Sequence, residues 1–302
     1  MLVGLPASGK STYAERLKEK GYHIHSSDKI REELTGDVNS QDKNIDVFAE
    51  LHKRVKNDLQ NGISCVYDAT NMSRKRRVSF LNDIKNIECE KICILFLTPI
   101  EECKRRNQER ERKVPEEVFD KMLKSFWVPM EYEGWDRVDV GILEGYEYHF
   151  PIEKTYNFDQ CNSRHSKRLF DHMNDTALYI QSNTNQNFKK TRRYRNLMLA
   201  AYYHDIGKLY TQTFINSKGE ETEDAHYYGH DGYGAYLYLL IEFYGCLFPD
   251  DARNIAALIN WHMSPYIMWE DSEKAMKRDR RMIGEEMYQD IMLLHEADVA
   301  AH

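Results

Sequence analysis

Short apolar runs alternate with longer amphipathic stretches over the first half of the chain. The strand-like runs are 22–26, 63–67, 91–97 and 138–143. The helical stretches between them are 11–20, 28–35, 42–61, 74–86, 99–112 and 115–127. In the third of these stretches, Ile45, Phe48, Val55 and Leu59 recur at helical spacing. Strands that alternate with helices predict an α/β domain, with a parallel sheet and helices on both faces, over residues 1–147.

The strand signals almost disappear after about residue 150. Helical stretches continue at 165–182, 194–204, 230–245, 251–262 and 283–299. Residues 209–228 are polar, with a turn at Ser217-Lys218-Gly219, and they predict a small hairpin. We therefore expect an all-α domain over residues 160–302, joined to the first domain by a linker near 146–162.

The composition fits two packed domains and no membrane partner. The 302 residues are 41% apolar, but no run of 18 apolar residues predicts a membrane span. No signal peptide is visible, and the six cysteines form no C-x-x-C pair, which favours reduced thiols in a cytoplasmic protein. The net charge of −7 does not by itself indicate a nucleic-acid partner. Basic clusters are more often solvated helix faces unless chemistry lies beside them, and they occur at 74–77, 104–113, 189–193 and 277–281.

A phosphate-binding loop of the form G-x-x-x-x-G-K-[ST] stands near the start of the chain. It reads Gly4-Leu5-Pro6-Ala7-Ser8-Gly9-Lys10-Ser11, and Thr12 follows in the predicted helix. The glycines let backbone N–H groups wrap a phosphate at the N-terminus of that helix. Lys10 can reach the β- and γ-phosphates, and Ser11 can hold Mg²⁺. Such a loop alone predicts binding of ATP or GTP and no particular reaction.

Two carboxylates and several arginines narrow the chemistry. Asp28 and Arg31 share one face of a helix start, where Asp28 could accept a proton from a hydroxyl or simply cap the helix. Arg31 could hold a phosphate through its bidentate fork. Asp68 follows a strand-like run and could lie near Mg²⁺, pair with Arg31, or form a turn. Arg106 and Arg110 could form a lid over the phosphates or a solvated helix face.

Together these motifs resemble the P-loop kinases that phosphorylate polynucleotide 5′-hydroxyl ends, over about residues 1–145. The resemblance rests on GLPASGKS, S-D-x-x-R, D-A-T-N, and R-N-x-x-R followed by V-P-x-x-V. It implies ATP and Mg²⁺ as cofactors, Asp28 as the general base, and Arg31 as a contact to the acceptor or the scissile phosphate. It also implies that Asp68 supports this arginine and that Arg106 and Arg110 belong to the lid. Related kinases of small molecules share much of the pattern, so the acceptor stays open.

Histidines and carboxylates fall at the ends of predicted helices in the second half. They are His172, His204, Asp205, His230, His262 and Asp298. Imidazoles and carboxylates that converge in a helical bundle suit Mn²⁺, Fe²⁺, Ni²⁺, Co²⁺ or Zn²⁺. A divalent ion bound there would activate water and polarise a phosphate. Any one of these histidines alone is more often an ordinary capping or surface residue, so the prediction depends on the set.

As a set, the second half resembles the HD-domain phosphohydrolases over about residues 160–302. The matching segments are F-D-H at 170–172, H-D-I-G-K at 204–208, Y-G-H-x-x-x-G-A at 228–235, W-H-M at 261–263 and A-D at 297–298. The resemblance implies that a first metal is bound by His172, His204, Asp205 and Asp298. It implies that His230 and His262 bind a second metal or the substrate phosphate, and that Lys208 contacts a phosphate oxygen. His165 stands at the spacing seen in the related domain of CCA-adding enzymes, and the last helix is expected to be clipped relative to a complete domain because few residues follow Asp298.

The two halves together predict a bifunctional RNA end-healing enzyme, in which a polynucleotide kinase is fused to an HD-type phosphatase. The kinase half would phosphorylate a 5′-OH, and the HD half would remove a 2′,3′-cyclic or 3′ phosphate. Its partners would be nucleic-acid ends, with RNA favoured, and a separate ligase; a homodimer is left open. One alternative is a small-molecule or nucleoside kinase joined to an HD nucleotidase. A second alternative is an HD half that senses nucleotides without catalysis.

Overall fold

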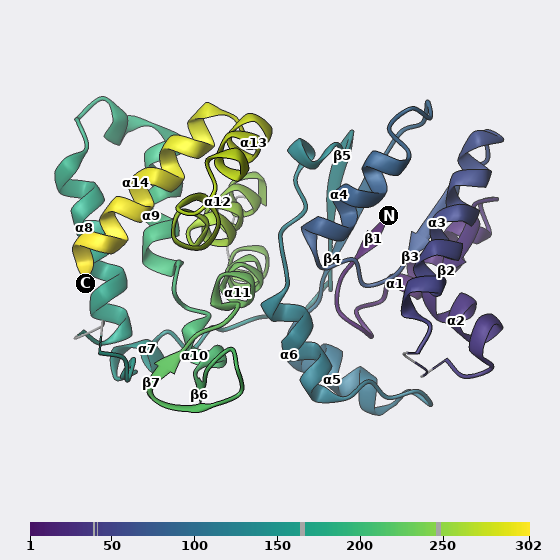
Figure 1. Cartoon of the computed structure of the whole chain (residues 1–302), viewed down its shortest axis with the longest axis horizontal. Helices are drawn as coiled ribbons and strands as arrows, with labels where there is room; N and C mark the ends of the chain where they lie inside the picture. The colour runs from purple at the N-terminus through teal and green to yellow at the C-terminus, as the bar shows by residue number, and fades with distance from the viewer. Residues whose placement is uncertain (39, 41, 164–166, 246–248) are drawn as a thin grey trace. The chain divides into compact units, whose positions relative to one another are not determined.

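The computed structural model describes all residues except 39, 41, 164–166 and 246–248 (Figure 1). The chain forms two compact units, and each is described here by itself. The first contains Met1–Met122 and Pro129–Gly145, and the second contains Leu123–Val128 and Tyr146–His302. The sequence pattern had placed 123–128 in the first domain and had treated 146–162 as a linker.

Side-chain contacts explain why Leu123–Val128 goes with the second unit. Asn260 binds this segment at two points: its Oδ1 accepts from the Val128 amide at 2.8 Å, and its Nδ2 donates to the Phe126 carbonyl at 3.0 Å. The Phe126 ring also packs edge-on against Tyr236, with the ring centroids 5.2 Å apart. These contacts span more than a hundred residues, so no local pattern could predict them.

The first unit is built on a five-stranded parallel sheet with the strand order β2-β3-β1-β4-β5. The strands are β1 (Leu2–Val3), β2 (His23–Ser26), β3 (Cys65–Asp68), β4 (Ile92–Leu97) and β5 (Arg137–Ile142). The helices that flank the sheet are α1 (Lys10–Lys18), α2 (Ser27–Thr35), α3 (Asn44–Gln60), α4 (Arg74–Asp83), α5 (Ile100–Gln108) and α6 (Glu116–Lys124) (Figure 1). Each predicted strand is found within two residues of its expected bounds, which confirms the parallel α/β fold.

Strand β1 is short but central. Leu2 and Val3 are 1% and 0% exposed, because β3 and β4 pair with the strand on either side. The chain crosses from β3 to β4 past β1, so the carboxyl end of β1 lies at a point where the strand order reverses. Ligands bind at such points in open parallel sheets. The loop that follows Val3 therefore begins where a nucleotide site is expected.

The second unit is mainly helical. Its helices are α7 (Glu153–Tyr156), α8 (Leu169–Asn183), α9 (Arg192–Tyr203), α10 (Lys208–Thr211), α11 (His230–Gly245), α12 (Pro249–Trp261), α13 (Glu273–Ile283) and α14 (Glu285–Ala301). Strands β6 (Thr213–Ile215) and β7 (Glu221–His226) form the expected antiparallel hairpin. Helices α11 and α12 pack together, and α8 packs against both α9 and α14. His165, which the sequence placed near the first metal ligand, lies outside the described residues.

Helix α13 was missed because its charged residues were interpreted only as a basic cluster. Ser272 caps this helix by accepting from the Ala275 amide at 3.2 Å. Its one fully buried acid, Asp279, accepts from the indole N–H of Trp269 at 3.2 Å. Among the described residues, no helix is long and apolar enough to cross a membrane.

Candidate active sites

The phosphate-binding loop is held in place by its glycines and by contacts from the neighbouring strands. Gly4 adopts φ +149°, and a Cβ there would lie 2.8 Å from the Phe96 carbonyl oxygen, so only glycine fits. The Gly4 amide donates to the Thr70 carbonyl at 2.9 Å, and Thr98 Oγ1 donates to the Ser8 carbonyl at 3.0 Å. The loop is thus fixed from the carboxyl ends of both β3 and β4, although β1 itself has only two residues.

Lys10 turns back onto the loop. Its Nζ donates to the carbonyl oxygens of Gly4 at 2.9 Å and Leu5 at 2.5 Å, and to Ser8 Oγ at 3.2 Å. Burial lowers the pKa of the Lys10 ammonium to about 8, although the nearby Asp68 carboxylate acts in the opposite direction. The arrangement keeps a desolvated cation in the loop, at the place where the motif binds the β- and γ-phosphates.

Ser11 and Asp68 meet at the end of β3. Ser11 Oγ donates to Asp68 Oδ2 at 3.0 Å, and burial raises the pKa of the Asp68 carboxyl. A loop hydroxyl beside a strand-end aspartate is the oxygen pair that holds Mg²⁺ in P-loop enzymes. The expected support of Arg31 by Asp68 is not borne out, since no hydrogen bond or ion pair joins them in the described part of the chain.

Arg31 turns toward α3 instead. Its Nη1 donates to the Ser40 carbonyl at 3.0 Å and to Asn44 Oδ1 at 2.5 Å. Its Nε is buried and makes no hydrogen bond, and burial lowers the pKa of this guanidinium. Asp28 lies one turn earlier on α2, about half exposed. The two residues predicted to act together are therefore on one helix but have different partners.

Asp28 pairs with an arginine that the sequence analysis did not single out. Arg112 Nη1 lies 2.8 Å from Asp28 Oδ1. Arg110 is exposed, and its positive charge acts to lower the pKa of Lys10. Arg106 points elsewhere: its Nε donates to Glu102 Oε1 at 2.6 Å within α5.

The predicted lid helix 99–112 ends early. Helix α5 stops at Gln108, so Arg106 and Arg110 do not share one helix face as expected. The chain turns after Gln108 because Asn107 binds the backbone of Val114 through both ends of its amide, at 2.8 and 2.9 Å. This turn is what brings Arg112 to Asp28. Arg112 therefore pairs with the proposed base, and Arg110 lies outside the helix that was expected to carry it.

Arg77, the last residue of the 74–77 basic cluster, is not part of a solvated helix face. Its guanidinium is fully buried and forms a two-point ion pair with Glu133, at 2.8 and 2.5 Å. It also donates to the carbonyls of Asn71 and Met72. The spacing of Arg77 with Phe80 and Leu81 on α4 places all three on the buried face of that helix. Arg77 is therefore a structural residue of the first unit.

In the second unit, the six predicted metal ligands come together in one buried cluster. They are His172 from α8, His204 and Asp205 after α9, His230 from α11, His262 after α12, and Asp298 from α14. All are at least nine-tenths buried. The convergence that the sequence predicted from five separate segments is therefore present.

Asp205 stands at the centre of this cluster. Its Oδ2 lies 3.3 Å from the Nε2 atoms of both His172 and His204, and its Oδ1 lies 3.2 Å from His230 Nε2 and 3.8 Å from His262 Nε2. Asp298 Oδ1 faces the first two imidazoles at 3.0 and 3.5 Å. Ligand atoms about 2.0–2.2 Å from one Zn²⁺ would be separated by about 3.4 Å, so these distances suit a metal. Asp205 therefore presents Oδ2 to His172 and His204, and Oδ1 to His230 and His262.

Three imidazoles are oriented by their own backbone. The Nδ1 atoms of His204, His230 and His262 each lie 2.6–2.9 Å from the carbonyl oxygen three residues earlier. A carbonyl only accepts, so each Nδ1 carries a hydrogen and each Nε2 faces the cluster. His204 Nε2 is buried without a hydrogen bond, as expected of a nitrogen that is positioned to bind a metal ion. The donor set therefore fits a divalent transition metal.

The two aspartates dominate the electrostatics of the cluster. Burial would lower the pKa of His204, but the Asp205 and Asp298 carboxylates outweigh it and raise the pKa to about 10. Burial, with the nearby His230 and His204, lowers the pKa of His262 to about 3, so this imidazole stays neutral. Lys208 and the imidazoles around Asp205 hold its pKa well below the usual range despite burial. The two aspartates are anionic, and the cluster attracts positive charge.

Lys208 and three residues not singled out from the sequence complete the site. Lys208 Nζ lies 2.7 Å from Asp205 Oδ2 and donates to Gln160 Oε1 at 2.8 Å. Tyr266 donates to Asp298 Oδ2 at 2.8 Å. His302 lies four residues after Asp298, with its Nε2 3.6 Å from Asp298 Oδ1. That i,i+4 spacing was the one signal in the sequence that could have identified His302.

Gly207 explains why the H-D-I-G-K segment needs a glycine. A Cβ at Gly207 would lie 2.0 Å from the His230 carbonyl oxygen and 2.7 Å from the Gly234 amide nitrogen. Any side chain there would push the segment after α9 away from the start of α11. The same close approach brings Asp205 and His230 within reach of each other.

Comparison with known proteins supports a kinase-like domain in the first unit. Residues 1–129 match a family model described as an AAA domain. With the loop and strand-end geometry above, this defines a P-loop kinase-like domain at the N-terminus, with ATP and Mg²⁺ as the implied cofactors. The chain is also 29% identical, over 148 residues, to the L-seryl-tRNA(Sec) kinase of Methanococcus maripaludis. That match covers 47% of this chain and 57% of the relative, and it supports an ATP-dependent kinase.

Proposed function

We propose that the chain is a bifunctional end-healing enzyme, in which the first unit phosphorylates a 5′-hydroxyl of RNA and the second removes a 2′,3′-cyclic or 3′ phosphate. The observation that carries the proposal is the presence of two phosphate-directed sites in one chain. One site joins Ser11 to Asp68 beside the phosphate loop, and the other gathers four imidazoles and the Asp298 carboxylate around Asp205. A separate ligase would then seal the healed ends, and the site of action would be the cytoplasm.

In the kinase step, Asp28 accepts the proton of the attacking hydroxyl. The hydroxyl oxygen bonds to the γ-phosphorus of ATP as the bond to the β–γ bridging oxygen breaks, and ADP leaves. Lys10 and Arg110 would balance the charge on the transferred group, and Ser11 and Asp68 would hold the Mg²⁺ that neutralises the phosphate oxygens. Arg112 holds the Asp28 carboxylate beside the lid turn, which makes it a positioning residue.

In the phosphohydrolase site, His172, His204, Asp205 and Asp298 would hold a first metal, and His230 and His262 a second metal or the phosphate. A bound divalent ion supplies Lewis acidity and an activated water. The protein residues do the positioning: the i−3 carbonyls orient the imidazoles, and Lys208 presents an ammonium to a phosphate oxygen. Gln160 holds Lys208 in that position.

A second candidate for the kinase acceptor comes from the relative. That protein is an L-seryl-tRNA(Sec) kinase, whose printed name gives a seryl group on a tRNA as the acceptor. The Asp28 carboxylate would serve equally well for the hydroxyl of a serine side chain or of a nucleoside. A seryl-tRNA is therefore the second candidate acceptor for the kinase site.

An acceptor panel tests the kinase assignment. Labelled ATP is offered with a 5′-OH RNA, a 5′-OH DNA, seryl-tRNA and free nucleosides, and transfer is quantified for each. We expect label on the 5′-OH RNA, lost in Lys10→Ala and kept in Lys18→Ala, whose exposed lysine lies on the same helix. Label on seryl-tRNA or nucleosides alone would replace the end-healing assignment with the corresponding alternative.

A phosphate-release assay tests the second unit. RNA with a 3′ or 2′,3′-cyclic phosphate is incubated with Mn²⁺, Ni²⁺, Co²⁺ or Zn²⁺. We expect release that is lost in Asp205→Ala and kept in Asp171→Ala, whose exposed carboxylate lies next to His172 on α8. Failure to release phosphate from either RNA with any of these metals would remove the phosphatase from the proposal.

A further inference from the structure

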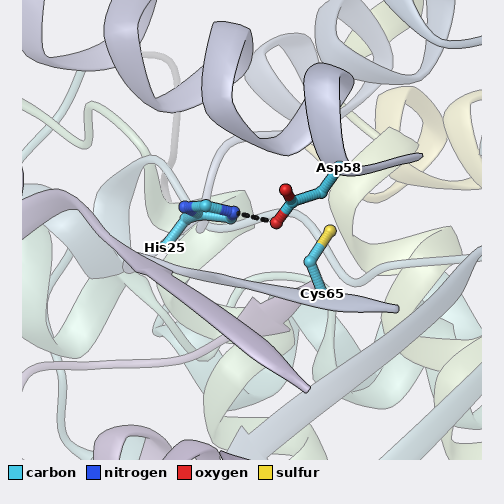
Figure 2. Close-up of side chains that lie close together, drawn as sticks. All are labelled: His25, Asp58 and Cys65. Carbon is cyan, nitrogen blue, oxygen red and sulfur yellow. Dashed lines mark hydrogen bonds and ion pairs between the residues drawn. The ribbon is translucent and has the colours of Figure 1, made fainter. Parts of the chain in front are cut away.

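A second mixed cluster of metal-binding side chains lies in the first unit, away from the phosphate loop. It consists of His25 from β2, Asp58 from the last turn of α3, and Cys65 from the start of β3 (Figure 2). Their ligand atoms all lie within 4.8 Å of one another. His23 stands two residues before His25 on the same face of β2 and contacts the same Asp58 carboxylate, so it is the candidate fourth donor, although it is not one of the three residues whose ligand atoms all lie close together.

The register of the sheet brings these donors together. His23 is the direct parallel partner of Cys65, and β2 is the edge strand of the sheet. Helix α3 packs on both β2 and β3, and it ends with Asp58 directed at the two strands. Three separate elements thus converge on one point at the sheet edge.

The distances place one carboxylate oxygen between two imidazoles. Asp58 Oδ2 lies 2.7 Å from His25 Nε2 and 2.9 Å from His23 Nδ1. The side chains of Asp58 and His25 are 10% and 15% exposed, whereas His23 is more than half exposed. The partly buried Cys65 thiol makes only a long contact of 4.0 Å to the Val55 carbonyl. The site is therefore lined by fixed donors on one side and is open to solvent on the other.

The donor chemistry selects the kind of ion. Two imidazoles, a carboxylate and a thiolate form a tetrahedral donor set that suits Zn²⁺ and excludes the oxygen-seeking Mg²⁺ and Ca²⁺. Ligand atoms on a tetrahedral Zn²⁺ are about 3.4 Å apart, so the two imidazoles need to move from Asp58 by only about 0.5–0.7 Å. Two neutral imidazoles and two anionic donors would neutralise the ion.

We propose that His23, His25, Asp58 and Cys65 bind one Zn²⁺ ion that ties the edge strand β2 to α3 and β3. With His23 as the fourth donor, the protein would complete the tetrahedron, and a site closed in this way is structural. Its consequence for the kinase is positional: β2 continues directly into α2, so the ion anchors the strand that leads into the helix carrying Asp28. The proposal does not depend on the acceptor or on the phosphohydrolase activity.

Cobalt spectroscopy of the full-length chain tests this site separately from the cluster around Asp205. Only a thiolate ligand gives the near-ultraviolet sulfur-to-Co²⁺ charge-transfer band, and the Asp205 cluster has no cysteine. Because the Asp205 cluster also takes up Co²⁺, we expect the band at saturation to have the intensity of one thiolate-bound Co²⁺ per chain, in the wild type and in Cys161→Ser, which removes an exposed thiol of the second unit. The band should be absent in Cys65→Ser and in His25→Gln, and Zn²⁺ should bleach it in the wild type.

A second test uses only the wild-type protein, so it remains valid if these variants fail to fold. Alkylation followed by peptide mass spectrometry compares the two thiols with and without Zn²⁺. We expect Zn²⁺ to slow the alkylation of Cys65 by at least about tenfold and to leave Cys161 unchanged. No charge-transfer band in the wild type, a band that persists in folded Cys65→Ser, or equal alkylation of Cys65 with and without Zn²⁺ would overturn the proposal.

Discussion

The buried ammonium of Lys10 makes nucleotide affinity depend on pH. Its pKa is about 8 instead of 10.5, because the loop removes it from water. That difference corresponds to about 3 kcal/mol in favour of the neutral amine. A bound triphosphate stabilises the ammonium and restores its pKa, so nucleotide binding takes up a proton between pH 8 and 10.5.

The size of the effect follows from the fraction of free protein that is charged. With a pKa of about 8, about one lysine in eleven is an ammonium at pH 9, so ATP should bind about tenfold more weakly than at pH 7. The phosphate does not add to this trend, since its second pKa of about 6 leaves it fully ionised above pH 8. The contribution of Lys10 to the stability of the folded state has the opposite pH dependence. The unfolded chain binds more protons at Lys10 in this window, so this lysine makes the folded state more stable as the pH rises.

Calorimetric titration with a non-hydrolysable ATP analogue at pH 7, 8 and 9 measures this effect. Two buffers with different ionisation heats report the proton uptake directly. Lys10→Arg should bind with a flat profile, because a guanidinium stays charged throughout. Asp205→Ala, in the other unit, should keep the wild-type profile. A wild-type affinity that is constant from pH 7 to 9, without proton uptake, would refute the electrostatic account of the loop.

Three further predictions concern the base, a buried ion pair and the metal cluster. Asp28→Asn should lower kcat for phosphoryl transfer by about 10²–10⁴ with ATP affinity unchanged, as measured by steady-state kinetics and nucleotide titration; an unchanged kcat would remove Asp28 as the base. Breaking the buried pair with Arg77→Met or Glu133→Gln should destabilise the first unit by about 3–5 kcal/mol in urea unfolding, whereas Arg137→Met in an exposed pair should cost less than about 1 kcal/mol. Removal of transition metals with a chelator should abolish phosphate release and leave the kinase activity intact once Mg²⁺ is restored. The variant His204→Ala should lower the metal content found by elemental analysis. Phosphate release that persists without metal would contradict a metal-dependent site.

Much of the fold was accessible from local patterns. The alternation of apolar and helical runs predicted the parallel sheet, and the histidines at helix ends predicted the cluster around Asp205. Both patterns are short-range signals: a strand or a helix end is encoded within a few residues. The resemblance to HD-domain phosphohydrolases then grouped the segments, which spacing alone could not have done.

The parts that could not be predicted depend on long-range packing. The burial of Arg77 requires Glu133, which lies 56 residues away, and nothing in the 74–77 cluster distinguishes this arginine except its spacing with Phe80 and Leu81. The partner of Asp28 could not be chosen from the arginines of 105–112, because the turn set by Asn107 decides which of them faces it. The His25 cluster forms only through sheet register, which the sequence does not display.

The central claim is that one chain carries two independent phosphate-directed sites. An RNA with a 5′-OH and a 2′,3′-cyclic phosphate, incubated with ATP, Mg²⁺ and a transition metal, allows both ends to be followed in the same reaction. The account predicts that wild type modifies both ends, that Lys10→Ala heals only the 3′ end, and that Asp205→Ala phosphorylates only the 5′ end. Loss of both activities in either folded variant, or the absence of modification at both ends in the wild type, would contradict it.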